Sequence, residues 1–155
     1  MSQRLRLEHP IGFALLIALC VPLAAHAVGS GPTTVPDPAP AADVEYDKGL
    51  RAKENKRYTE AISGFRRAVD LRPEFPEAWN ELGFALRQTG QYAEALKAYD
   101  QALRIRPNFP EALEYLGEAY VKLGRTDEAR AILKRLAPLD RVRAQELEEA
   151  IRAGR

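Results

Sequence analysis

The side chains that most often perform chemistry in proteins are confined to the first 27 residues of this chain. His9, His26 and Cys20 are the only residues of their kinds. From residue 28 onward the sequence therefore offers no imidazole base, no thiolate nucleophile, and neither of the usual nitrogen and sulfur ligands of zinc. Its glutamates recur with a fixed spacing, as surface residues of a repeat do, and do not converge on a pocket. We expect no enzyme, no metal site and no cofactor.

The first 41 residues predict a secretory signal peptide (1–27) followed by a linker (28–41). Two arginines precede an apolar run over 11–25, and Ala-His-Ala then supplies small residues two apart before the predicted cleavage after Ala27. This pattern predicts a periplasmic or secreted protein. The alternative is an uncleaved inner-membrane anchor, but a spanning helix needs about 20 apolar residues and Pro22 interrupts this run. The four prolines of 28–41 predict a semi-rigid linker or a disordered leader.

The charge balance gives no support to nucleic-acid binding. The chain has 23 basic and 22 acidic residues, and removal of residues 1–27 leaves 21 of each. Non-specific binding to nucleic acids depends on a strong cationic excess. We therefore expect no nucleic-acid partner and, after cleavage of the signal, no membrane partner.

From residue 42 the chain repeats itself every 34 residues, in units 42–75, 76–109 and 110–143. "LRPEFPEAW" at 71–79 returns as "IRPNFPEAL" at 105–113. Within a unit, apolar residues lie on one helical face, stop at a break such as "QTGQ", and then resume, which predicts two helices. A single helical hairpin cannot bury both of its faces, whereas stacked copies can. The residues in register include Gly49, Gly83 and Gly117; Ala61, Ala95 and Ala129; and Phe65, Tyr99 and Leu133.

The second unit resembles a tetratricopeptide repeat. The family's Trp, Leu-Gly, Tyr, Ala, Phe/Tyr, Ala and Pro positions are held by Trp79, Leu82, Gly83, Leu86, Ala95, Tyr99, Ala102 and Pro107, of which Leu86 alone departs from the expected type. The resemblance implies an all-α fold, a tetratricopeptide-type α-solenoid of three helical hairpins over 42–143. Residues 139–155 are predicted to form a C-terminal capping helix and tail, with Asp140 as the N-cap. A separate peptide-binding or coiled-coil role of this tail is the alternative.

In tetratricopeptide proteins the first helix of each hairpin lines a concave groove that binds peptides. Carried over by position, this groove holds eight acidic residues against three basic ones, Lys53, Arg87 and Lys122. The resemblance implies a protein partner that inserts a basic, or mixed basic and apolar, segment, with aromatic rings for apolar and cation–π contact. The alternative is that the acids only solvate exposed helices. The residues predicted to bind the partner are Tyr46, Asp47, Leu50, Asn80, Glu81, Phe84, Glu114, Tyr115 and Glu118.

One mode of binding is disfavoured, namely the clamp that holds a partner's C-terminal carboxylate. Repeats of that kind place Lys, Asn and Arg in the groove, whereas this chain has acidic, aromatic and aliphatic residues there. We therefore predict a non-enzymatic adaptor or scaffold of the bacterial cell envelope. Two alternatives are a structural protein that self-associates through its repeat ends or C-terminal helix, and a membrane-anchored accessory subunit of an envelope complex.

Overall fold

The computed structural model describes residues 38–154, and all regular secondary structure in this range is α-helical. The predicted signal peptide and the linker up to residue 37 lie outside the described residues. Within the described range no helix combines the length and the apolar character that a membrane span requires. The helices are α1 (Pro38–Glu54), α2 (Tyr58–Leu71), α3 (Pro76–Gln88), α4 (Tyr92–Ile105), α5 (Pro110–Lys122), α6 (Thr126–Leu136) and α7 (Arg141–Ala153).

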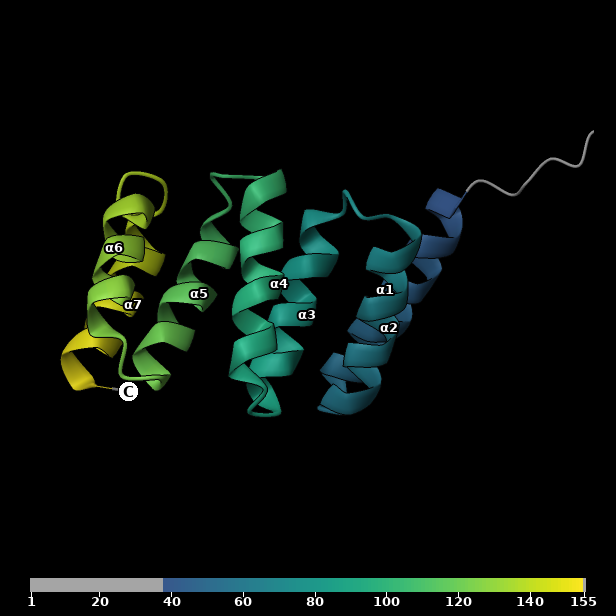
Figure 1. Ribbon diagram of the computed structural model, residues 1–155, viewed down its shortest axis with the longest axis horizontal. Coiled ribbons are helices and arrows are strands. Elements are labelled where there is room, and N and C mark those ends of the chain that lie inside the picture. Colours follow the sequence, from purple (N-terminus) through teal and green to yellow (C-terminus); the bar gives the residue numbers. More distant parts are fainter. Residues whose placement is uncertain (1–37, 155) are drawn as a thin grey trace, which may run out of the picture. The chain divides into compact units, whose positions relative to one another are not determined.

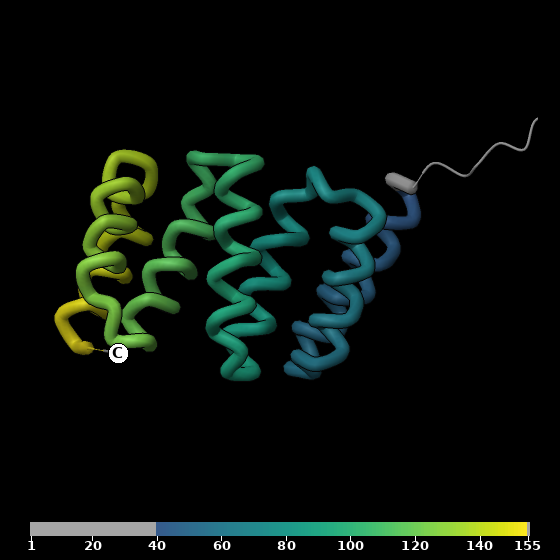
Figure 2. Tube along the Cα trace, viewed as in Figure 1, coloured from purple at the N-terminus to yellow at the C-terminus, as the bar shows by residue number. Residues whose placement is uncertain are grey.

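The first six helices form three hairpins, as the 34-residue period predicts. Helix α1 packs on α2, α3 on α4 and α5 on α6, and neighbouring hairpins meet where α2 contacts α3 and α4 contacts α5. Figure 1 shows the hairpins side by side in the order of the sequence, and the trace in Figure 2 follows the same path. Helix α7 packs on both α5 and α6 at the end of this array. The predicted all-α solenoid of three hairpins and a capping helix is confirmed.

Prolines set the corners between the hairpins. Helices α2 and α4 each end two residues before a proline, Pro73 or Pro107, while Pro76 and Pro110 each begin the next helix. Proline cannot sit inside a helix because it lacks an N–H, but it suits the first position, where that N–H would have no acceptor. Within the second hairpin the turn depends on Gly90, whose φ of 78° is left-handed, as its place in "QTGQ" predicts.

Helix α1 begins at Pro38, inside the stretch that the sequence predicts as linker. Pro38 and Pro40 lie in its first turn, where proline is tolerated for the same reason. The first hairpin thus starts with a helix of 17 residues, whereas α3 and α5 have 13 each.

In the first two hairpins, a glycine of the first helix leaves room for an aromatic ring of the second helix. A Cβ added to Gly49 would lie 2.5 Å from the ring of Phe65, and one added to Gly83 would lie 2.6 Å from the ring of Tyr99. Both rings are completely buried. The alanines of the repeat, which the sequence places at the same close contact, are also completely buried; they are Ala61, Ala95 and Ala129.

In the third hairpin, the side chain that packs on the glycine comes from α7 and not from α6. A Cβ added to Gly117 would meet Leu147 of α7 at 2.5 Å, although the period predicts Leu133 in that place. Leu133 is smaller than the rings at the equivalent positions and is only partly buried, whereas Leu147 is fully buried. Asp140 caps α7 as predicted, because its carboxylate accepts from the backbone N–H groups of Val142 and Arg143, at 3.0 and 3.1 Å.

Candidate partner-binding face

The first helices of the three hairpins bring predicted binding residues together on one surface, which we call the α1–α3–α5 face. Phe84 of α3 lies at its centre. The ring of Tyr115, from α5, is 5.5 Å from the ring of Phe84, and the ring of Tyr58, at the start of α2, is 6.2 Å away. Tyr115 and Phe84 were predicted to belong to the site, while Tyr58 was not, because the helical period places it outside the first helices. All three side chains are partly exposed and can contact a partner.

Two basic side chains lie beside this aromatic strip and neutralise acids of the face. Lys53 of α1 pairs with Glu81 of α3 at 2.6 Å, and Arg87 of α3 pairs with Glu118 of α5 at 2.8 Å. The Lys53 ammonium and the Arg87 guanidinium each lie 5.5 Å from the centre of the Phe84 ring. These ion pairs join consecutive hairpins. The centre of the face is therefore aromatic and nearly neutral, and it is less acidic than the residue types alone suggest.

Glu114 holds α7 in place and is not accessible to a partner. It is 5% exposed and forms an ion pair with Arg143 of α7, which also pairs with Glu111 at 3.0 Å. Burial raises the pKa of the Glu114 carboxyl to about 7, against the opposing effect of Arg143 and with a further upward contribution from the adjacent carboxyl of Glu146. Glu114 was predicted to bind the partner, but in the structure its carboxylate binds Arg143 of α7.

Three more predicted residues lie deeper than a surface site suggests. Tyr46 packs against the rings of Phe65 and Phe75, at 5.7 and 4.8 Å, and Leu50 packs against the core. Burial, together with nearby carboxylates, raises the pKa of Tyr46 to about 12, so its phenol stays protonated and can donate a hydrogen bond. Asn80 is 3% exposed, and its side-chain oxygen has no hydrogen-bond partner among the described residues.

The charges that remain for a partner are concentrated on α1. Asp47 and Glu54 are exposed and form no ion pair with any residue in 38–154, and the same is true of Lys122 on α5. The third hairpin has buried Val121 at the repeat position of Lys53 and Arg87. Nowhere in the described range do three His, Cys, Asp or Glu side chains gather as they would around a metal ion.

The repeated corner "RPxFPEA" makes contacts that the sequence analysis did not predict. The guanidinium of Arg72 lies 3.6 Å from the ring centre of Phe75 and pairs with Asp43 of α1 at 2.5 Å. The same two contacts recur one repeat later, made by Arg106, Phe109 and Glu77. Each corner arginine thus ties its corner to the first helix of the preceding hairpin. The signal was the recurrence of arginine three residues before phenylalanine.

Two models of the tetratricopeptide repeat family match this chain. One matches residues 46–110 and the other residues 86–151, so that together they extend over the hairpins and most of α7. No curated protein matches the sequence.

Solved tetratricopeptide domains share the fold at low sequence identity. The domain of OM64 from Arabidopsis has a TM-score of 0.71 and 21% identity, and the match covers 75% of this chain and 98% of that domain. The second domain of human RPAP3, in complex with the HSP70 peptide SGPTIEEVD, has a TM-score of 0.70 and 22% identity. That match covers 74% of this chain and 98% of the domain. The TPR2B domain of yeast Sti1, in its complex with pHsp70, has a TM-score of 0.69 and 17% identity. That match covers 73% of this chain and 94% of the domain.

Proposed function

This chain belongs to the tetratricopeptide repeat family, and we propose that it is a non-enzymatic module that binds a segment of another protein on the α1–α3–α5 face. The observation that carries this proposal is the partly exposed aromatic strip around Phe84, flanked by cations that link consecutive hairpins. The structures of RPAP3 and Sti1 domains with chaperone peptides or partners support a protein ligand for this fold. Aromatic residues and arginine commonly supply most of the binding energy in such contacts.

The partner segment that fits this face carries a Lys or Arg close to a large apolar residue. Asp47 and Glu54 offer the unpaired carboxylates that attract the cation. Phe84 of α3 and Tyr115 of α5 offer the apolar surface for the large side chain. The acidic peptides held by the RPAP3 domains would meet these carboxylates unfavourably, so the proposal does not extend to peptides of that kind.

The unpaired acids give the cleanest test of this proposal. A basic and apolar peptide, selected for binding to the full chain, is titrated by fluorescence anisotropy against the wild type and the double variant Asp47→Lys, Glu54→Lys. We expect about a tenfold loss of affinity in the variant, because attraction between exposed charges becomes repulsion. Reversal of Glu81, Glu114 or Glu118 is a poorer test, since each already forms an ion pair between helices.

The control is a double reversal of equal charge away from the face. Asp127 lies at the start of α6 and Glu149 lies on α7, at the end of the array opposite to α1, and both are exposed. The variant Asp127→Lys, Glu149→Lys should bind the peptide within about twofold of the wild type, because exposed charges beyond a Debye length are screened. An equal loss in both variants, or a loss in neither, would contradict binding at the α1–α3–α5 face.

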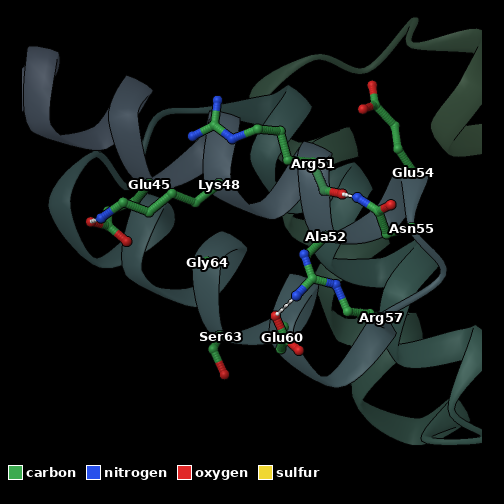
Figure 3. A pocket seen from close by; sticks show the side chains of 10 residues that line it. All are labelled: Glu45, Lys48, Arg51, Ala52, Glu54, Asn55, Arg57, Glu60, Ser63 and Gly64. Atoms are coloured by element: carbon green, nitrogen blue, oxygen red, sulfur yellow. Dashed lines mark hydrogen bonds and ion pairs between the residues drawn. The ribbon is translucent and has the colours of Figure 1, made fainter.

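Self-association through the first hairpin has little physical support. The outer side of that hairpin has a hollow of about 700 Å³ (Figure 3). In the second hairpin, the equivalent side packs Trp79 and Leu82 towards α2 of the preceding hairpin. The first hairpin has Glu45 and Lys48 at these two repeat positions, paired with each other at 2.5 Å. Stacking another hairpin here would remove both charges from water.

The other end of the array is closed in a similar way. In the second hairpin, Leu96 is partly buried and Leu103 is 7% exposed where the array continues. Their counterparts in the third hairpin are Arg130 of α6 and Ala137 directly after it, both exposed. We therefore infer that the chain is a monomer in solution. Light scattering coupled to size-exclusion chromatography should give the mass of one chain at all concentrations, and growth of the mass with concentration would support the structural-assembly alternative.

We further propose that the module acts in the bacterial cell envelope, after export to the periplasm or beyond. Support for this location comes only from the sequence of residues 1–27. When the full chain is expressed in a bacterial host, mass spectrometry of the periplasmic fraction should find a protein that begins at Val28. An intact N-terminus in the membrane fraction would instead support the alternative of a membrane-anchored accessory subunit.

A further inference from the structure

A pocket of about 540 Å³ lies between α2, α3 and α4. It is distinct from the α1–α3–α5 face, because Leu82 and Leu86 point to the side of α3 opposite to Phe84. Its apolar lining consists of Trp79, which is partly exposed, and of Val69, Leu82, Leu86 and Ala98, which form a base that is 2–4% exposed.

The pocket exists because position 98 is small while its surroundings are large and apolar. The third hairpin has Ile132 at this repeat position, a larger side chain that is 7% exposed. The first hairpin has Gly64 there, but Glu45 and Lys48 make that hollow polar. Of the three hairpins, only the second combines a small residue at this position, Ala98, with large apolar residues around it.

Trp79 forms a wall that is held in place. Its indole N–H donates a hydrogen bond to the carbonyl of Pro73 at 2.8 Å, which fixes the orientation of the ring. The side chain packs against the core, as its position in the repeat predicts, yet it remains partly exposed at the pocket. A tryptophan face that is open and held in place offers apolar area at little cost in conformational entropy.

The rim of the pocket carries a defined pattern of charge. Arg66 of α2 and Glu94 of α4 pair across one part of the rim at 2.5 Å. About one helical turn further along each helix lie Asp70 and Lys97, which are exposed and form no ion pair with other residues of 38–154. The rim therefore has an unpaired carboxylate on the α2 side and an unpaired ammonium on the α4 side.

We propose that this pocket is a second binding site, for a protein segment that inserts one large apolar side chain between a basic and an acidic residue. The apolar side chain lies against Trp79 and above Ala98. The basic residue of the segment pairs with Asp70, and the acidic residue pairs with Lys97. Because the pocket and the α1–α3–α5 face are separate, one chain can bind two segments at the same time, which is what an adaptor requires.

Peptides selected from a random displayed library on the full chain provide the probe. Trp79 is the only tryptophan of the sequence, so its emission reports occupancy of the pocket. The variant Ala98→Ile places in the pocket the residue that the third hairpin uses. Peptides that shift the emission of Trp79 should lose about tenfold in affinity for this variant, as expected when a central anchor loses its pocket. They should bind the Asp47→Lys, Glu54→Lys variant within about twofold of the wild type, because that variant changes another face.

Reversal of the rim charges gives a test that leaves the pocket open. The variant Asp70→Lys, Lys97→Glu should weaken these peptides several-fold, and peptides with their basic and acidic residues exchanged should recover the affinity. Circular dichroism and denaturant unfolding check that both variants keep the fold.

Three results would overturn the proposal. The first is unchanged affinity of the selected peptides for Ala98→Ile. The second is a set of peptides that all lose binding in the Asp47→Lys, Glu54→Lys variant and none in Ala98→Ile, which would uphold the α1–α3–α5 face and reject the pocket. The third is the failure of the library to yield any binder, which would contradict both sites.

Discussion

The second hairpin and the end of the array each pack a large side chain against a helical glycine, but that side chain comes from a different element in each case. In the second hairpin, Gly83 receives the ring of Tyr99, which the 34-residue period places there. At the end of the array, Gly117 receives Leu147 from α7, which no equivalent position predicts. A repeat therefore specifies contacts between like units, whereas the last unit needs residues of its own to cover it.

The ion pairs at the two kinds of junction differ in burial. Arg106 and Glu77 pair at an inner corner, with side chains 45% and 38% exposed. Arg143 pairs with Glu114 below α7, where the side chain of Glu114 is 6% exposed. Since a buried charge depends on its partner far more than an exposed one does, the junction with α7 is electrostatically the more sensitive of the two.

The largest expected effect separates these two arginines. Arg143→Ala leaves Glu114 buried without its cation and should lower the free energy of unfolding by about 3 kcal/mol. Arg106→Ala removes an exposed pair and should cost about 1 kcal/mol or less. Urea denaturation of both variants measures the difference. Equal losses would show that burial does not distinguish the two junctions.

A smaller effect is expected from adding a methyl group at the two glycines. Gly83→Ala forces a Cβ against the completely buried ring of Tyr99, which should lower the unfolding free energy by about 2 kcal/mol. Gly117→Ala places a Cβ against both methyl groups of Leu147, at 2.5 and 2.8 Å, and this side chain is also completely buried, so we expect a loss of similar size there. Thermal unfolding of the two variants tests this expectation, and a gain of stability in either variant would contradict it.

An effect of similar size is a pH dependence localised at the junction with α7. Burial raises the pKa of Glu114 from its ordinary value of 4.5 to about 7, so the folded chain favours the protonated carboxyl. The stability from this group is fully present below pH 4.5 and is lost as the pH rises through about 7. Relative to Glu114→Gln, the wild type should lose about 2 kcal/mol of unfolding free energy between pH 5 and pH 8. Unfolding curves that stay parallel for the two proteins over this range would contradict the assignment.

The sequence predicts most of the local structure because the causes are local. Pro76, Pro110 and Asp140 act on the backbone within one turn of a helix, and each has its predicted place in the structure. The start of α1 was less predictable, because Pro38 is compatible both with an extended linker and with the first turn of a helix.

The candidate site could be predicted only in part. The repeat position correctly brings Phe84 and Tyr115 together on one face. It does not show that Asn80 and Glu114 are almost completely buried, nor that Tyr58 joins the aromatic strip. Burial at these positions depends on the neighbouring helices, which differ from one hairpin to the next.

The sequence by itself determined the period, the hairpins, their corners and the absence of histidine and cysteine after residue 27, since these follow from residue types and spacing along the chain. The tertiary structure decided which charges remain available to a partner. Lys53 reaches Glu81 across 28 residues of sequence, and Arg143 reaches Glu114 across 29. Such pairs form only where packed helices bring two side chains within a few ångströms, because an ion pair depends on distance and burial and not on residue type alone.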